Sequence, residues 1–259
     1  MKAIRELDKA ACSSLKFILC DIDDTITTGG KLTRAAYNAL WDLYERGYGV
    51  IPVTGRPAGW CDMIIREWPV KAVVGENGAF VYYNDGAHIK TFTHPSVAGV
   101  DAIKKLEGVK EACLEGVPGC RVARDQFARI YDLAIDFNED PPYLGLEAAE
   151  KIRDICVSMG AEAKISSIHV NAWFGNYNKL SMTELFMKEI LKEEHIKEKV
   201  IFFGDSPNDE PMFEYFPLSC AVANILPFEK ILHHLPSYVT SYAGGEGFAE
   251  AAAHILTLQ

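Results

Sequence analysis

The sequence lacks the cysteine patterns of metal-binding and disulfide-stabilised proteins. Its seven cysteines are an odd number, none stands in a CxxC pair, and several lie inside apolar segments such as FILC and IRDIC. Zinc fingers and small secreted scaffolds are therefore excluded. We expect buried thiols in a reducing compartment, and hence a cytoplasmic protein.

Long apolar runs and an excess of basic residues are also missing. The apolar stretch 15–20 contains Lys16 and ends at Asp21, so it is too short for a signal sequence or a membrane span. The chain has 26 basic and 36 acidic residues, a net charge of −10, and no local basic patch. We therefore expect neither a membrane partner nor a nucleic-acid partner.

What the chain does have is a large apolar fraction, 49%, arranged in short runs that alternate with helical periodicity from residue 16 onward. This alternation predicts βα units around a parallel sheet, an α/β fold. Thr33 is a suitable helix N-cap, and an Asn-Gly pair at 77–78 predicts a hairpin turn. The predicted strands are 16–22, 48–55, 71–75, 200–206, 220–224 and 237–241, and the predicted helices are 32–46, 59–68, 181–194 and a C-terminal helix.

The rhythm changes between residues 87 and 178. There the pattern predicts helix, strand, strand, helix, strand, strand, with strict alternation in IYDLAIDF. We interpret 87–178 as an α+β insertion and residues 1–86 and 179–259 as the two halves of one core.

Polar clusters follow three of the predicted core strands. In an open parallel sheet, ligands bind at the carboxyl ends of the strands, so these clusters are candidates for one common site. They are Asp21, Asp23 and Asp24 after the first strand, Thr54, Gly55 and Arg56 after the second, and Gly204, Asp205 and Ser206 after a later one, with Asn208 and Asp209 just beyond.

Carboxylates of Asp21, Asp23 and Asp205 in one pocket would repel one another unless a divalent cation lay among them. Oxygen ligands without His or Cys favour Mg²⁺. A calcium loop starting at Asp21 would need Gly and Glu where Ile26 and Leu32 stand, so that alternative is excluded. An acidic turn without a ligand is the simpler alternative.

Four segments resemble, in order, the motifs of the haloacid dehalogenase (HAD) superfamily: DIDDT, VTGR, the Asn178-Lys179 pair before a helix, and GDSPND. The position of the insertion resembles the Cof-type, class IIB capped phosphatases. This resemblance implies a Rossmann-like parallel-sheet core with an inserted cap domain. It also implies a Mg²⁺-dependent phosphatase for a small phosphate monoester, a sugar phosphate or related metabolite, acting through an aspartyl-phosphate.

The resemblance also assigns catalytic roles. Asp21 would attack phosphorus, and Asp23 would protonate the leaving alcohol and later deprotonate the hydrolytic water. Thr54 and Lys179 would donate to the phosphoryl oxygens. Alone, Thr54 would be an ordinary strand-end hydroxyl and Lys179 a solvated lysine at a helix start.

For the metal site, the resemblance implies Mg²⁺ held by Asp21, the backbone carbonyl of Asp23, and Asp205. Asp209 would support this shell or orient Lys179. Asn208 would brace the metal loop, or simply cap the helix that follows.

The insertion is expected to close over the pocket and to select the leaving group. Candidate substrate-binding residues are Arg56 and Asn77 in the core and Arg124, His169 and Asn171 in the insertion. Each also has a structural alternative, namely a solvated arginine, a turn asparagine or a structural histidine.

Three other functions stay open. A phosphomutase would use the same aspartyl intermediate. A phospho-receiver module would place its acceptor on the third strand, where Glu76 and Asn77 stand, and would have no large insertion. A non-catalytic sugar-phosphate sensor would not need Asp23. The oligomeric state is not predicted.

Overall fold

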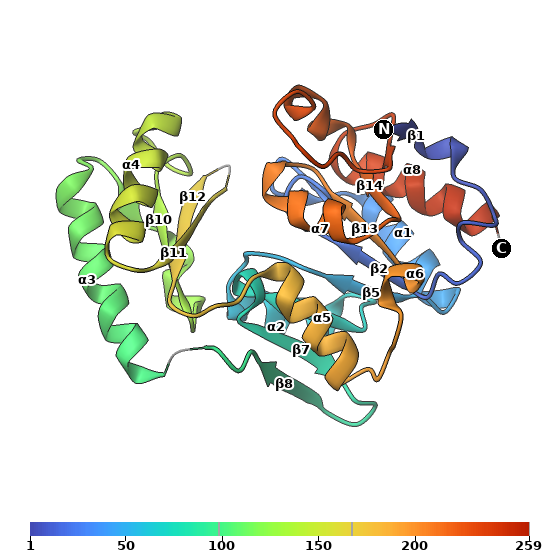
Figure 1. Cartoon of the computed structure of the whole chain (residues 1–259), viewed down its shortest axis with the longest axis horizontal. Helices are drawn as coiled ribbons and strands as arrows, with labels where there is room; N and C mark the ends of the chain where they lie inside the picture. The colour runs from blue at the N-terminus through green and yellow to red at the C-terminus, as the bar shows by residue number, and fades with distance from the viewer. Residues whose placement is uncertain (98, 167, 259) are drawn as a thin grey trace.

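An open parallel sheet organises one part of the chain, and a smaller antiparallel sheet lies beside it (Figure 1). The computed structural model describes residues 1–97, 99–166 and 168–258. The parallel sheet has the order β1-β15-β14-β13-β2-β5, which confirms the predicted α/β class. Its strands are β1 (Lys2–Ala3), β2 (Phe17–Cys20), β5 (Gly49–Pro52), β13 (Val200–Gly204), β14 (Ser219–Ala221) and β15 (Tyr238–Val239).

Helices cover both faces of this sheet. Ile18 and Cys20 of β2 pack with α1 (Arg34–Glu45), α2 (Ala58–Glu67) and α8 (Gly244–Thr257). Phe17 and Leu19 point to the other face and pack with α5 (Lys179–Glu189) and α7 (Glu210–Tyr215). Burial on both faces explains why the strands are continuous apolar runs.

A hairpin extends this core as predicted. Strand β6 (Ala72–Gly75) bridges to Val53 through Val74 and pairs with β7 (Phe80–Asn84), which pairs with β8 (Ile89–Thr93). Because β8 lies inside the predicted insertion, this pairing favours an insertion that begins after β8. The division of the chain into a core and an inserted cap at 87–178 stays a proposal.

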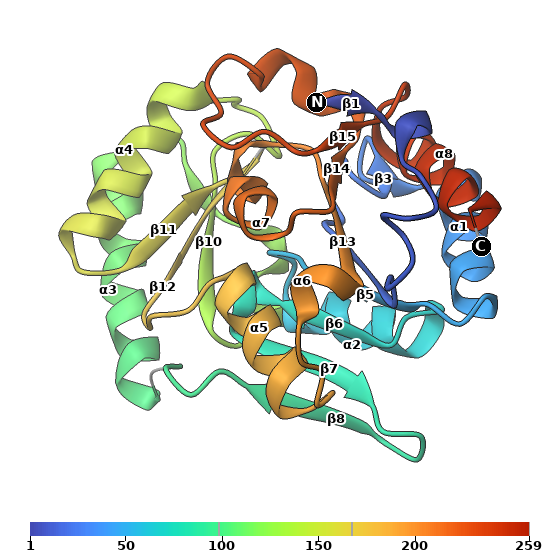
Figure 2. The same cartoon turned by 45° about the vertical axis from the view of Figure 1, so that its right-hand side comes forward.

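The inserted module has the predicted order of elements. One face of its sheet, with Leu133, Ile135, Val170 and Ala172, packs on α3 and α4. Figure 2 shows these helices on the side of the sheet away from the core. The elements are α3 (Val100–Gly116), β9 (Arg121–Val122), β10 (Asp132–Asp136), α4 (Gly145–Ser158), β11 (Glu162–Ile165) and β12 (His169–Trp173), in the strand order β11-β12-β10-β9.

Several details differ from the prediction. Thr33 does cap α1, accepting a hydrogen bond from the Ala36 amide at 3.2 Å, but Leu32 belongs to a short hairpin and not to the helix. The predicted helix 181–194 ends at Glu189. The remaining elements are β3 (Thr27–Thr28), β4 (Lys31–Leu32), α6 (Ile196–Lys199) and 3₁₀ turns at Ile4–Glu6, Glu76–Gly78, Arg124–Ala128, Pro207–Asp209 and Ala223–Phe228.

The expected buried thiols are present, since all seven cysteines are free and buried. Burial raises the pKa of the Cys20 and Cys61 thiols well above the ordinary value, which keeps both protonated. Among the described residues, no helix combines the length and the apolar character that a membrane span requires.

Gly78 allows the hairpin turn to approach the start of α5. Its φ is +108°, and a Cβ there would lie 2.2 Å from the carbonyl oxygen of Asn178. Gly86 has a similar φ of +98° but open space around it. We expect Gly86→Ala to lower the free energy of unfolding by about 1 kcal/mol through backbone strain alone.

Gly78→Ala should lower the free energy of unfolding by at least about 2 kcal/mol more than Gly86→Ala does, because the backbone at Gly78 or Asn178 would have to move. Urea unfolding of the two variants measures the difference. Equal losses would show that this close approach is not a constraint on the fold.

Candidate active site

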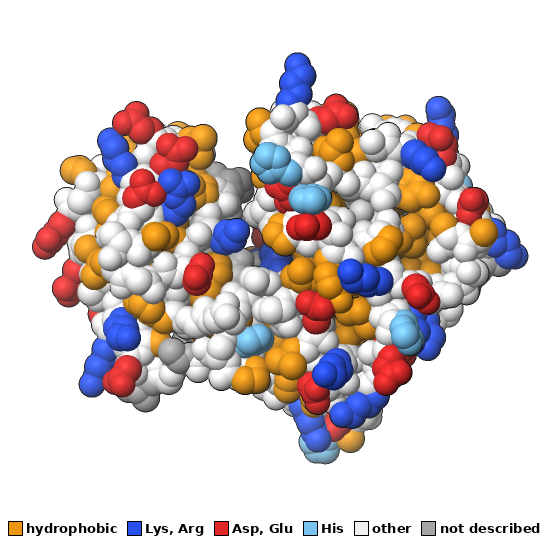
Figure 3. Space-filling view, viewed as in Figure 1, with side chains coloured by type: hydrophobic (Ala, Val, Ile, Leu, Met, Phe, Trp, Pro, Cys, Tyr) orange, Lys and Arg blue, Asp and Glu red, His pale blue; other side chains and the backbone are white. Residues whose placement is uncertain are grey.

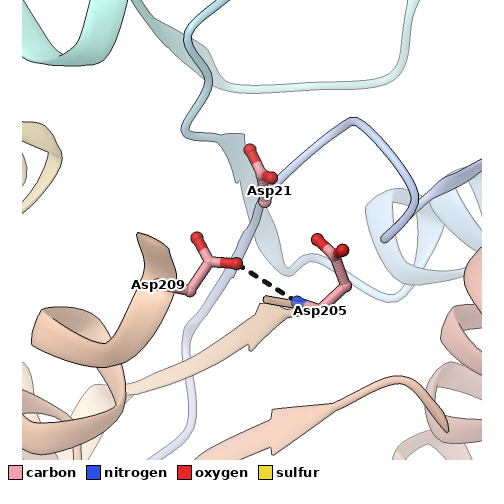
Figure 4. Close-up of side chains that lie close together, drawn as sticks. All are labelled: Asp21, Asp205 and Asp209. Carbon is pink, nitrogen blue, oxygen red and sulfur yellow. Dashed lines mark hydrogen bonds between the residues drawn. The ribbon is translucent and has the colours of Figure 1, made fainter. Parts of the chain in front are cut away.

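Three aspartates meet at the carboxyl edge of the parallel sheet. Asp21 follows β2, Asp205 follows the adjacent strand β13, and Asp209 lies just beyond (Figure 4). One oxygen from each carboxylate lies within 4.8 Å of the others, and all three residues are buried. The strand register brings Asp21 and Asp205 together, since the Asp21 amide donates to the Phe203 carbonyl at 2.9 Å.

A largely buried lysine faces two of these carboxylates. Lys179 Nζ lies 2.9 Å from Asp21 Oδ1 and 3.2 Å from Asp209 Oδ1. Lys179 is the first residue of α5, and the N-cap Asn178 fixes this helix start by accepting from the Ser181 amide at 2.9 Å. One cation therefore stands against three carboxylates.

The imbalance of charge shows in the pKa values. Burial, reinforced by the nearby Asp209 and Asp23 and opposed by Lys179, raises the pKa of Asp21 to about 7. Burial and repulsion from Asp209 and Asp21 raise the pKa of Asp205 to about 9. Burial alone would lower the pKa of Lys179, but Asp209 and Asp21 raise it above its ordinary value. A second cation would relieve this repulsion.

The free oxygens indicate where such a cation fits. Both oxygens of Asp209 accept hydrogen bonds, from Lys179 and from the Asp205 amide at 3.1 Å. Asp205 Oδ1 accepts from the Thr25 hydroxyl at 2.9 Å. Among the residues that the structure describes, Oδ2 of Asp21 and Oδ2 of Asp205 accept none. Two open carboxylate oxygens in a buried acidic site suit Mg²⁺.

Thr54 and Asp23 flank the acidic group differently. Thr54 follows β5 and is fully buried, and its hydroxyl oxygen accepts from the Arg56 amide at 3.1 Å. The Asp23 carboxylate turns away to Arg56, with an Nη2–Oδ1 distance of 2.6 Å, and the Arg56 guanidinium lies 4.8 Å from the centroid of the Trp60 ring. The side chain of Asp23 is therefore not part of the buried acidic group.

A cavity of about 1050 Å³ opens above this edge. Figure 3 shows the surface hollowed between the parallel-sheet core and the inserted module. Asp21, Asp23, Lys179 and Asn208 line it from the core, and the polar face of the inserted sheet lines it from the other side. All five predicted substrate-binding residues also line it: Arg56, Asn77, Arg124, His169 and Asn171.

The three predicted residues of the inserted module already have protein partners. Arg124 forms an ion pair with Asp140 at 2.7 Å, and His169 Nε2 lies 2.9 Å from Glu139. The side-chain Nδ2 of Asn171 donates to Asp132 Oδ2 at 3.1 Å. Their structural roles are thus evident, and their contact with a substrate stays a prediction.

Other side chains in the cavity wall lack partners. Asn77 Nδ2, Trp173 Nε1 and the Tyr177 hydroxyl are buried without a hydrogen bond to any described residue. A buried polar group without a partner is costly, and all three of these groups belong to residues that line the cavity.

Comparison with known proteins identifies the family. The sequence model of the haloacid dehalogenase-like hydrolases matches residues 18–114 and 150–251. The chain belongs to this family. The predicted HAD membership and the predicted hydrolase class are confirmed.

Individual relatives agree with this assignment. The HAD chain is 28% identical over 244 residues to a phosphoglycolate phosphatase of Methanothermobacter thermautotrophicus, covering 93% of this chain and 99% of the relative. A solved structure from Thermoplasma acidophilum is similar with a TM-score of 0.72, at 22% identity and over 95% of this chain and 99% of that one. A HAD subclass IIB sugar phosphatase has a TM-score of 0.64, at 15% identity and over 94% and 100%. The predicted Cof-type, class IIB fold is confirmed, and the 28%-identical relative and the subclass IIB neighbour are both named as phosphatases.

Sequence reasoning missed three residues of this HAD site. Thr25 lies beside Asp205, but it stood in the first motif without an assigned partner. Glu76 and Arg129 belong to a buried network beside the cavity, in which both bond to Asp132. A charged residue directly after the apolar run KAVVG was the available signal for Glu76, whereas nothing near Arg129 distinguished it from its charged neighbours.

The raised pKa values of Asp21 and Asp205 predict a pH-dependent response to Mg²⁺. Both pKa values are higher in the folded protein than the ordinary value of an aspartate in the unfolded chain. Without metal, these two groups therefore stabilise the fold at low pH, and the free energy of unfolding falls as the pH rises toward 9. Mg²⁺ would bind these carboxylates in their deprotonated form. Its stabilising effect on the melting temperature should therefore be larger at pH 8.5 than at pH 6, as scanning calorimetry can measure.

Asp205→Asn should remove most of this Mg²⁺ response, whereas Asp42→Asn on the exposed face of α1 should keep it. An equal rise in melting temperature at both pH values would contradict the assignment of these carboxylates as ligands.

Proposed function

We propose that this HAD hydrolase is a Mg²⁺-dependent phosphatase that cleaves a small phosphate monoester through a covalent intermediate on Asp21. The observation that carries the proposal is the placement of Asp21, with one free carboxylate oxygen, between Lys179 and Asp205 at the floor of the cavity. A cytoplasmic location is part of the same proposal.

In the first step Asp21 Oδ1, the oxygen beside Lys179, attacks phosphorus and the bond to the leaving oxygen breaks, which leaves Oδ2 for the metal. Lys179, held on Oδ1, orients the carboxylate and offsets its charge. Asp23 donates a proton to the departing alcohol. In the second step Asp23 takes a proton from water as that water attacks, which releases phosphate and restores the Asp21 carboxylate.

The metal would be held by Asp21, Asp205 and the backbone carbonyl of Asp23. When bound, Mg²⁺ supplies positive charge beside the transferring phosphoryl group. Asp209 keeps Lys179 and the Asp205 loop in place through its two hydrogen bonds. The Ser206 hydroxyl donates to Asn208 at 3.1 Å, which braces the same loop, and Asp209, not Asn208, is the N-cap position of α7. Thr54 would donate its hydroxyl hydrogen to a phosphoryl oxygen.

Arg56 serves Asp23 in this scheme. Its two-pronged ion pair holds the Asp23 carboxylate at the cavity wall, and its contact with the Trp60 ring fixes the guanidinium. We therefore place Arg56 as the residue that positions Asp23 in its ionised form, as the base of the second step, in addition to any contact with substrate.

The substrate is a small phosphorylated metabolite. Phosphoglycolate is the first compound to test, because it is the substrate in the name of the 28%-identical relative. Sugar phosphates are the second class to test, because the structural neighbour of HAD subclass IIB is called a sugar phosphatase. The residues of the cavity wall also include unpartnered hydrogen-bond donors.

Asp21→Asn should abolish phosphate release from these monoesters, and chelation of divalent metal should do the same, because both remove a group needed in the first step. A panel of phosphate monoesters assayed with and without Mg²⁺ measures this. Asp42→Asn, the same change at an exposed site, should keep full activity. Turnover by Asp21→Asn would reject the covalent mechanism, and turnover only with a bisphosphate, without free phosphate, would indicate a phosphomutase.

Asp23→Asn should behave differently for different leaving groups. With p-nitrophenyl phosphate the leaving group needs no proton, so the first step should proceed while the second slows by about 10²-fold or more. Phosphoenzyme should then accumulate and be detectable by mass spectrometry after acid quench. An alkyl phosphate should give little phosphoenzyme. The same accumulation from both substrates would show that Asp23 is not the acid.

A further inference from the structure

One buried carboxylate joins the parallel-sheet core to the inserted module. Glu76 follows β6, is fully buried, and has a left-handed backbone with φ of 44°. Its two oxygens accept four backbone hydrogen bonds. The donors are the amides of Ala58 at 3.0 Å, Ile130 at 2.9 Å, Tyr131 at 2.6 Å and Asp132 at 3.2 Å.

These donors come from two distant segments. Ala58 begins α2, directly after the loop with Thr54 and Arg56, whereas residues 130–132 lead into β10 of the inserted module. Backbone donors on both oxygens leave this carboxylate fully paired, which is what a buried charge requires.

Arg129 makes a second connection beside the first. Its Nη1 donates to the Gly55 carbonyl at 3.1 Å and to the Asp132 carboxylate at 2.9 Å, and its side chain is almost fully buried. Asp132 also accepts the hydrogen bond from Asn171. A continuous set of hydrogen bonds therefore runs from Gly55, in the loop that contains Thr54, through Arg129 and Asp132 to Asn171 of β12 in the cavity wall.

This junction is separate from the two places where the chain passes between β8 and α3 and between β12 and α5. With these two chain connections alone, the inserted module could rotate about them relative to the core. The contacts of residues 129–132 with Glu76 and Gly55 attach the module to the core at a third place, next to the loop that contains Thr54. The geometry of the cavity thus depends on Glu76, although its carboxylate has no free oxygen for a substrate.

We infer that Glu76 is a positioning residue that sets how the polar face of β10 and β12 lies over the loop at 54–56. The kinetic part of this inference rests on the proposed function. Glu76 touches no reacting atom, and it acts through the amides of 130–132 and through Ala58.

The test is Glu76→Gln, which keeps the shape of the side chain but turns one acceptor into a donor that faces backbone N–H groups. We expect the KM for the best substrate to rise about tenfold or more, because the cavity wall moves. Inhibition by inorganic phosphate should stay within about twofold of wild type, because in the proposed scheme phosphate is bound by core residues, Thr54 and Lys179, with the metal, and not by the inserted module. Hydrogen exchange of the amides at 130–132 should quicken by about tenfold or more. Glu115→Gln, an exposed site on α3, is the matched control and should change none of these.

A rise in KM matched by an equal weakening of phosphate inhibition, or unchanged exchange at 130–132, would overturn the inference. If Glu76→Gln does not fold, Arg129→Lys is the second variant, because it keeps the positive charge but loses the planar guanidinium that bonds to both Gly55 and Asp132. It should likewise raise the KM while leaving inhibition by phosphate nearly unchanged. Normal KM and normal exchange in Arg129→Lys would equally overturn it. If the wild-type protein releases no phosphate from any monoester, the proposed function fails, while the exchange experiment still tests the junction.

Discussion

The structure depends on the placement of three buried carboxylates against one lysine. Asp21 and Asp205 are neighbours because β2 and β13 pair in parallel register, with Cys20 opposite Phe203. That arrangement is unfavourable unless donors and cations surround it. Thr25, the Asp205 amide and Lys179 meet part of this need. The remaining negative charge suits a cation, and this is the basis of the proposed Mg²⁺ site.

The inserted module meets the opposite requirement, since it must cover this charged edge while leaving room for a substrate. Its sheet does so by alternation along β12, where Val170 and Ala172 pack on helices and His169 and Asn171 face the cavity. Both residues are paired within the module, His169 with Glu139 and Asn171 with Asp132. They therefore face the cavity without leaving their own side chains unpaired.

The sequence predicted the acidic edge because its signals are local: an apolar strand followed by aspartate predicts a polar strand end wherever it occurs. It did not predict the pairing of Asp23 with Arg56 or the role of Glu76, because both depend on which loops meet in three dimensions. The extra strand β8 was assigned to the insertion because its alternation is weak and its residues are mostly exposed. Asn208 was expected to brace the metal loop, and the simpler alternative was a cap on the following helix; the cap position of α7 is one residue later, at Asp209.

A crystal structure of the protein soaked with Mn²⁺, a scattering substitute for Mg²⁺, tests the acidic site most directly. We expect one anomalous peak in contact with the free carboxylate oxygens of Asp21 and Asp205, with Lys179 still on Asp21 Oδ1. An anomalous peak elsewhere, or none in this acidic group, would contradict it.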